Sequence, residues 1–316
     1  MMRVDVLALE GSSPAALGVT FDVLDAVNRL AGEPVFEWRT LVTDGSVAKL
    51  RGGVSAPARP LSKAKPRDLV IVLGIGACDD AAVEERIAAP DALVAARWLH
   101  SAWRRGATVA ASCTGVFLLG RAGLLDGRRC TTTWWLTSKL KSLFPESLSD
   151  TDSMLTDDTR VWTAGASFAH IDLMFGLVAR FAGPALAEDA ARYTVVDQRA
   201  SQARYVMPGF LAAQDPIARE VEAYVRRRLA KPFTLQDLAQ QTGTTTRTLN
   251  RRLALATGLS PMRFAQKIRV DAALHLLQTT RLSLEIVAER VGFEDSSALY
   301  RLIRRHTGRS PSLFRA

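Results

Sequence analysis

Cys113 stands between two apolar runs in the stretch ASCTGVFLLG, residues 111–120. The residues before it read as a strand and those after it as a helix, which is the layout of a nucleophile elbow, and Gly115 would let the helix approach closely. The free N–H groups and positive dipole of a helix start lower the pKa of a thiol and favour a bound carboxylate or oxyanion. The pattern predicts a catalytic thiol or the floor of a ligand pocket, with a buried structural cysteine as the plain alternative.

A catalytic thiol also needs a base, and His170 is the best-placed histidine. It follows the loop TAGASF after a predicted strand, so it would lie at the same end of a sheet as Cys113. Asp172 stands two residues later and could orient the imidazole. In the alternative, which we favour, His170 and Asp172 only begin the next helix, whose dipole stabilises the acid. A weaker hypothesis is redox sensing through Cys113 and Cys130.

The net charge of +9 is concentrated near the C-terminus. Residues 217–316 carry 18 Lys+Arg and 8 Asp+Glu, a net charge of +10, whereas residues 1–216 carry a net charge of −1. A basic domain beside a neutral one suggests a polyanionic partner for the basic one, although a solvated basic surface gives the same count. Charge alone does not decide between these two readings.

The basic part contains an internal repeat, LAQQTGTTTRTLNRRLALATGLSP at 238–261 and VAERVGFEDSSALYRLIRRHTGRSP at 287–311. Both copies read as helix, glycine turn and helix, with Gly243 and Gly292 at matching positions and the same Thr-Gly and Ser-Pro endings. That is the helix-turn-helix pattern, whose second helix can enter the major groove of DNA. A helix over 263–278 joins the copies and would hold them about one DNA turn apart, roughly 34 Å.

The second helix of each copy is predicted to read double-stranded DNA. Positions near a helix start should reach base edges, where arginine pairs with guanine and asparagine with adenine, and later arginines should reach phosphates. In the first copy this helix spans about 245–256, and the contacts would be Thr245, Thr246, Arg247, Asn250 and Arg251. In the second copy the helix spans about 296–306, and the contacts would be Ser296, Ser297, Tyr300, Arg301, Arg304 and Arg305. An all-helical packing module with exposed arginines is the alternative, but two matched copies with this charge favour DNA binding.

Residues 1–195 alternate short β-rich runs with helical ones, whereas residues 215–316 read as helical throughout. We expect strands at 3–9, 35–42, 68–74, 107–112 and 159–165, and helices at 17–31, 91–106 and 170–182. This alternation predicts an α/β domain of flavodoxin-like type, a parallel sheet with helices on both faces, followed by an all-α domain with two helix-turn-helix units. Residues 196–214 lack clean periodicity and are interpreted as a linker.

Composition narrows the class of protein. Three cysteines, an odd number in a long chain, argue against a disulfide framework, and the start MMRVDVLALEG acquires charge too soon for a secretory signal. The charge-free run at 106–120 has 15 residues, which is too short to span a bilayer. We therefore expect a cytoplasmic protein with reduced thiols, no membrane contact, and neither a metal site nor a cofactor.

Residues 217–316 resemble the DNA-binding domain of AraC/XylS-type transcriptional regulators over its full length. The resemblance lies in the repeated helix-turn-helix unit, the matched turn glycines and the paired Thr-Gly and Ser-Pro endings. It implies a bacterial regulator, usually an activator, that contacts two successive major grooves and often recruits RNA polymerase.

Residues 3–195 resemble the ThiJ/PfpI branch of the class I glutamine amidotransferase-like fold, in the opening strand and in DLVIVLG, ASCTGVFLLGRAGLLDG and TAGASFAHIDL. Together the two halves resemble the GlxA-type regulators. The resemblance implies an N-terminal domain that senses a small metabolite, often an amino acid or amine, in a chain that forms homodimers. The ligand-binding residues would then be Cys113, Thr114, Gly115, Gly74, Thr133, Trp134 and His170, with Trp135 as a further candidate for the pocket wall.

The sequence departs from the enzymes of that branch. They often have His directly after the Cys, where this chain has Thr114, and a Glu in the loop after the first strand, where only Glu10 stands at the edge. Regulators of this group often have His before the Trp, where this chain has Thr133. We therefore expect a ligand-responsive regulator and not an enzyme. The alternative is a cysteine-dependent amidase or hydrolase with an attached DNA-binding domain.

Overall fold

The computed structural model describes residues 1–315, so Ala316, the last residue of the predicted 215–316 domain, lies outside the described residues. The chain divides into two compact units, Met1–Ala200 and a second that begins at Ser201. This boundary falls inside the predicted linker, 196–214. That segment is structured in its second part, where it contains a short 3₁₀ helix η4 (Ala203–Tyr205) and α8 (Pro208–Ala213).

The first unit is built on a seven-stranded sheet in the order β10-β11-β7-β6-β1-β2-β5. All neighbours are parallel except β10 and β11, which are antiparallel. The strands are β1 (Met2–Leu7), β2 (Phe36–Val42), β5 (Arg59–Pro60), β6 (Leu69–Val72), β7 (Thr108–Ser112), β10 (Leu155–Asp158) and β11 (Val161–Ala164). The predicted α/β class with a mainly parallel sheet is confirmed.

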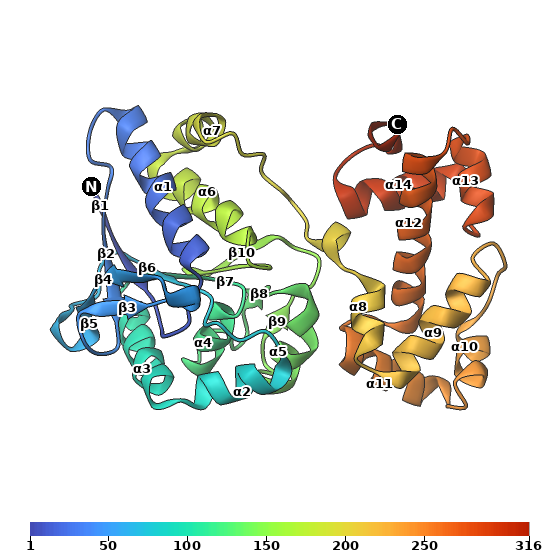
Figure 1. Cartoon of the computed structure of the whole chain (residues 1–316), viewed down its shortest axis with the longest axis horizontal. Helices are drawn as coiled ribbons and strands as arrows, with labels where there is room; N and C mark the ends of the chain where they lie inside the picture. Colours follow the sequence, from blue (N-terminus) through green and yellow to red (C-terminus); the bar gives the residue numbers. More distant parts are fainter. Residues whose placement is uncertain (316) are drawn as a thin grey trace. The chain divides into compact units, whose positions relative to one another are not determined.

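Helices cover both faces of this sheet (Figure 1). One face carries α1 (Pro14–Ala31), α6 (Ala169–Ala182) and α7 (Pro184–Tyr193), and the other carries α2 (Asp80–Ala88), α3 (Pro90–Arg104), α4 (Gly115–Arg121) and α5 (Thr137–Leu143). The double cover explains why every residue of β6 and β7 is buried, since such strands have no solvent face. The sequence did not predict α2, α7, the β3–β4 hairpin (Val47–Lys49 and Ser55–Pro57) or the short pair β8–β9 (Arg129–Cys130 and Leu148–Ser149).

The second unit is helical, as predicted. Its helix-turn-helix units are α10 (Leu235–Gln241) with α11 (Thr246–Thr257), and α13 (Leu284–Arg290) with α14 (Ser296–Thr307). The long α12 (Pro261–Thr279) joins them, and α9 (Pro216–Arg227) precedes the first. The Thr234 and Asp237 side chains form the predicted capping box at the start of α10. Within residues 1–315, none of the helices is both long and apolar enough to cross a membrane.

Candidate functional sites

Cys113 lies on a strained turn between β7 and α4. Its φ of 55° is unusual for a non-glycine residue, and its N–H donates to the carbonyls of Ala164 (3.1 Å) and Gly165 (2.8 Å), which hold the turn against the end of β11. A Cβ on Gly115 would lie 2.7 Å from the carbonyl oxygen of Leu73, so only glycine lets α4 start this close to the sheet. The strand, sharp turn and close helix approach have the predicted geometry.

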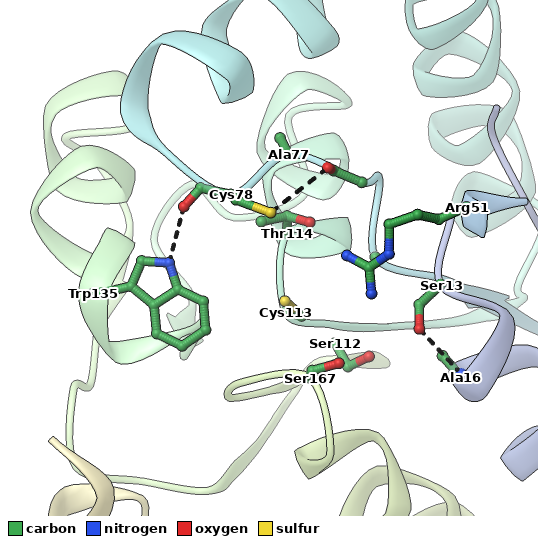
Figure 2. A pocket seen from close by; sticks show the side chains of 12 residues that line it. Ser13, Ala16, Arg51, Ala77, Cys78, Ser112, Cys113, Thr114, Trp135 and Ser167 are labelled. Atoms are coloured by element: carbon green, nitrogen blue, oxygen red, sulfur yellow. Dashed lines mark hydrogen bonds between the residues drawn. The ribbon is translucent and has the colours of Figure 1, made fainter. Parts of the chain in front are cut away.

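A pocket of about 200 Å³ opens at the carboxyl ends of the parallel strands (Figure 2). Cys113, Thr114 and Gly74 line it, as the sequence predicted. The other lining residues come from the segments that follow β1, β3, β6 and β11, from the start of α1, from the last residue of β7 and from the 3₁₀ helix η3 (Trp134–Leu136): Ser13, Ala16, Arg51, Gly76, Ala77, Cys78, Ser112, Trp135 and Ser167. Of these, the sequence marked only Trp135.

Four of the predicted ligand-binding residues do not line this pocket. Gly115 faces the sheet, and Thr133 is fully buried. Trp134 is also buried and packs edge-on against Trp135, with ring centroids 5.0 Å apart, so the second tryptophan of the pair forms the wall and the first forms core. His170 is the fourth, and its surroundings support the structural alternative that the sequence favoured over its role as a candidate base.

His170 is enclosed between α1 and β7. Its Nε2 lies 2.8 Å from the hydroxyl of Thr20 and its Nδ1 lies 2.8 Å from the hydroxyl of Ser112, so both ring nitrogens are occupied. Burial lowers the pKa of His170 from 6.5 to about 4, which keeps the ring neutral. The imidazole is therefore a core hydrogen-bonding group, and the proposed base for Cys113 is wrong.

Asp172 does not orient that imidazole either. It accepts hydrogen bonds from the backbone N–H of Arg199 (2.8 Å) and from the Arg199 guanidinium (2.6 Å from Nη2 to Oδ2), and its side chain is 5% exposed. The same guanidinium donates to the Phe168 carbonyl. The Asp172–Arg199 pair therefore holds the last residues of the first unit against α6. This structural role agrees with the structural interpretation of the His-x-Asp pattern.

The thiol of Cys113 is not activated. Burial raises its pKa, and the hydrogen bonds from Thr114 and the positive charge of Arg51, which act in the opposite direction, do not outweigh that effect. The predicted lowering of this pKa is therefore wrong. Cys130 is fully buried, its pKa is raised to about 11 by burial, and it does not line the pocket. The second thiol at the pocket is Cys78, so the pairing of Cys113 with Cys130 has no structural support.

The two predicted DNA-reading helices expose most of the residues that the sequence marked. Leu249 and Leu253 of α11 and Leu299 and Ile303 of α14 face the core. The opposite faces carry exposed Thr246, Arg247 and Arg251, and exposed Ser297, Tyr300, Arg301, Arg304 and Arg305, while Asn250 and Ser296 are half-buried. Thr245 is the N-cap of α11 and accepts from Thr248 N–H, so it precedes the helix proper.

Comparison with known proteins gives the two units a family. A model of the DJ-1/PfpI family matches residues 3–180, and a helix-turn-helix domain model matches residues 238–316. The HTH-type transcriptional regulator CdhR of Pseudomonas aeruginosa is 30% identical over 314 residues, 98% of this chain and 90% of that protein. The regulator GbdR of the same organism is 26% identical over 98% of this chain and 82% of its own length.

Solved structures agree with these matches. An AraC family transcriptional regulator from Pseudomonas putida superposes with a TM-score of 0.53 and 26% identity, covering 61% of this chain and 100% of that one. DJ-1beta of Drosophila melanogaster, with a TM-score of 0.51 and 15% identity over 62% of this chain and 98% of its own, shares the fold. The relatives that span both units are named as regulators and not as enzymes. The chain therefore belongs to the DJ-1/PfpI family, as one of the transcriptional regulators that join such a domain to an AraC-type helix-turn-helix region.

Proposed function

We propose that this chain is a cytoplasmic transcriptional activator that responds to a small metabolite, an amino acid or amine, bound in the pocket at Cys113. The observation that carries the proposal is one chain holding both parts: a pocket at the carboxyl ends of a parallel sheet, and two recognition helices with exposed arginines. Both ring nitrogens of His170 are hydrogen-bonded in the core, so the hydrolase alternative has no base beside Cys113. This favours a pocket that binds a ligand without converting it.

The ligand part of the proposal is tested by heating the full chain with a panel of amino acids, amides and amines. A compound that binds only the folded state raises the melting temperature, and it should do so for wild type and for Cys113→Ala. The same compound should change the affinity of the full chain for promoter DNA. A compound that is chemically converted by wild type but not by Cys113→Ala would overturn the receptor reading and restore the enzyme.

The DNA part of the proposal assigns base reading to the start of α11 and phosphate contacts to the arginines further along each helix. Selection from a randomised duplex library tests this. Arg247→Ala should relax the choice at about one base pair, at a cost of roughly 1–3 kcal/mol for the preferred sequence. Arg251→Ala, the matched control in the same helix, should weaken all sequences alike. A uniform loss for Arg247→Ala would contradict its base-reading role.

Homodimerisation and recruitment of RNA polymerase complete the proposal. Paired half-sites are usual for helix-turn-helix regulators, and the resemblance to AraC-type regulators supports both points. Sedimentation of the full chain should give twice the mass of one chain. Transcription with purified polymerase on a promoter that carries the selected site should rise when the regulator and its metabolite are added. A monomer, or repression in that assay, would contradict the corresponding part.

A further inference from the structure

Arg51 gives the pocket its charge. It is the single charged side chain among the pocket's lining residues, and no carboxylate lines this pocket. Figure 2 shows its guanidinium pointing into the space between Ser13 and Cys113. The pocket therefore presents a positive group to a ligand and has no acidic side chain with which to pair a ligand's ammonium group.

The guanidinium of Arg51 has no protein partner among the described residues. Among residues 1–315 it makes no hydrogen bond or ion pair with the protein, although other arginines of the same unit do: Arg39 pairs with buried Asp5 at 2.6 Å and Arg199 with Asp172 at 2.6 Å. Arginine's planar fork of donors fits a carboxylate in a bidentate way. A guanidinium without a protein partner at a pocket is therefore suited to a carboxylate supplied by a ligand.

The backbone beneath Arg51 is fixed even though its side chain has no partner. The N–H of Arg51 donates to the Ser12 carbonyl at 3.0 Å, and the Leu50 N–H donates to the Val54 carbonyl at 2.8 Å. Gly52 (φ 74°) and Gly53 (φ 77°) form the tight turn between these points, in a conformation that favours glycine. The turn places the arginine beside the loop that carries Ser13, and a ligand would not need to order the backbone.

Neutral groups supply the rest of a small binding site. The Ser13 hydroxyl accepts from the Ala16 N–H at 3.4 Å, which leaves its own proton to donate. The indole of Trp135 is held by a hydrogen bond from Nε1 to the Cys78 carbonyl at 3.1 Å and offers a flat wall. The volume of about 200 Å³ exceeds the roughly 150 Å³ that accommodates benzene in an engineered cavity.

We infer that the effector is a small carboxylate and that Arg51 binds its carboxylate group, with Trp135 packing against the remainder of the molecule. The inference rests on the proposed sensing function and narrows it. Of the two effector classes, amino acids fit this pocket because they carry a carboxylate. Amines without a carboxylate fit less well, because they leave the Arg51 guanidinium unpaired and place a second positive charge beside it.

The experiment is a melting-temperature screen of the full chain with matched probes: the proteinogenic amino acids and short-chain carboxylates, the amides of each, and primary and quaternary amines without a carboxylate. Calorimetry then gives a Kd for each stabilising probe with wild type, Arg51→Gln, Arg51→Lys and Arg59→Gln. Arg59 is the control, because it is an exposed arginine of the same unit that does not line the pocket.

We expect stabilisation by one or more carboxylates and not by their amides. Arg51→Gln should weaken binding by about 10- to 100-fold, from the usual strength of a hydrogen bond to a charged group. The Kd of Arg51→Lys should lie between those of Arg51→Gln and wild type, because lysine keeps the positive charge and loses the planar pair of donors. Arg59→Gln should bind as wild type does.

Three results overturn the inference. If amines or amides stabilise wild type and carboxylates do not, the sensing function stands and the carboxylate assignment fails. If a carboxylate binds equally to wild type and Arg51→Gln, a different group holds it. If no compound of any class stabilises the chain, the sensing function itself fails and the inference fails with it.

Discussion

The buried polar side chains of the sheet unit and those on the predicted DNA-reading helices are held in opposite ways. In the sheet unit, His170 is bound by two hydroxyls and Asp172 by Arg199. In the helical unit, the arginines at 301, 304 and 305 are exposed, and within residues 1–315 their guanidinium groups make no hydrogen bond or ion pair. Buried polar groups must be satisfied internally, whereas a surface that binds phosphate must keep its donors free. Changes in the first set should alter stability, and changes in the second should alter DNA binding.

The largest effect should follow from removing the three exposed arginines of α14. Replacing Arg301, Arg304 and Arg305 together by Ala should cost about 4.5 kcal/mol of DNA-binding free energy, roughly two-thousandfold in Kd, if each loses one charged hydrogen bond at the lower end of the usual strength. The slope of log K against log salt should flatten by about 2.7, since each phosphate contact contributes about 0.9. Titration of a labelled mixed-sequence duplex at several salt concentrations measures both quantities.

This variant should unfold like wild type. An unchanged salt slope would show that these side chains do not reach phosphates. A large loss of stability would break the comparison, because it would give the arginines an internal role.

Asp172→Ala should have the opposite profile. Removing one partner of a buried ion pair leaves Arg199 without its carboxylate and should cost about 3 kcal/mol in the free energy of unfolding. All six tryptophans precede residue 163, so their fluorescence in urea follows the sheet unit alone. The control is Asp25→Ala, which removes an exposed partner of Arg29 in the same unit and should leave the midpoint unchanged. Equal losses for the two variants would show that burial of the Asp172 pair does not matter.

The pH dependence of the sheet unit should reveal His170. The pKa of His170 is 6.5 in the unfolded chain and about 4 in the folded one. The unfolded chain therefore takes up this proton first, and the free energy of unfolding falls as the pH drops from 6.5 towards 4. Between pH 7 and pH 5 the loss should be about 2 kcal/mol. His170→Gln should remove this part of the pH dependence. The same pH dependence in wild type and His170→Gln would place the titration at another residue.

Much of this fold follows from sequence pattern. The strands β1, β2, β6 and β7 and the helices from α9 onward lie where apolar periodicity predicts them, because burial of one face or both imposes that period. The short helix α8 lies in the segment that was interpreted as a linker. The helix-turn-helix units were predictable because the sequence repeats with its turn glycines. The short strands β8 and β9 have only two residues each, too few to show a period.

The pocket was predictable only in part, for a physical reason. Gly74, Cys113 and Thr114 lie within two residues of the ends of buried strands, so their place at the carboxyl edge could be inferred. Arg51 could not, because the loop at 49–54 reaches the pocket through hydrogen bonds to the distant loop at 9–13. The partners of His170, Thr20 and Ser112, lie 150 and 58 residues away along the chain, so no local pattern shows that its nitrogens are occupied.

A finer comparison lies between the two recognition helices. The start of α11 has no acidic residue: its N-cap is Thr245, followed by exposed Thr246 and the positively charged Arg247. The start of α14 is acidic: its N-cap is Asp295, which follows the exposed Glu294. The hydrogen bond from the Ala298 N–H holds the pKa of Asp295 below its ordinary value, so its carboxylate is charged at neutral pH. Since carboxylates repel phosphates, the start of α11 should approach DNA more easily than the start of α14.

The smallest effect should come from exchanging these caps. Asp295→Asn keeps a good N-cap and removes the charge, so DNA affinity should rise severalfold at low salt, and the gain should shrink as salt screens the repulsion. Thr245→Asp makes the reverse change in α11 and should weaken binding. Both variants should unfold near wild type because the cap is kept. Weaker binding by Asp295→Asn would show that its carboxylate accepts a hydrogen bond from a base such as cytosine, which would make the start of α14 a reader of sequence.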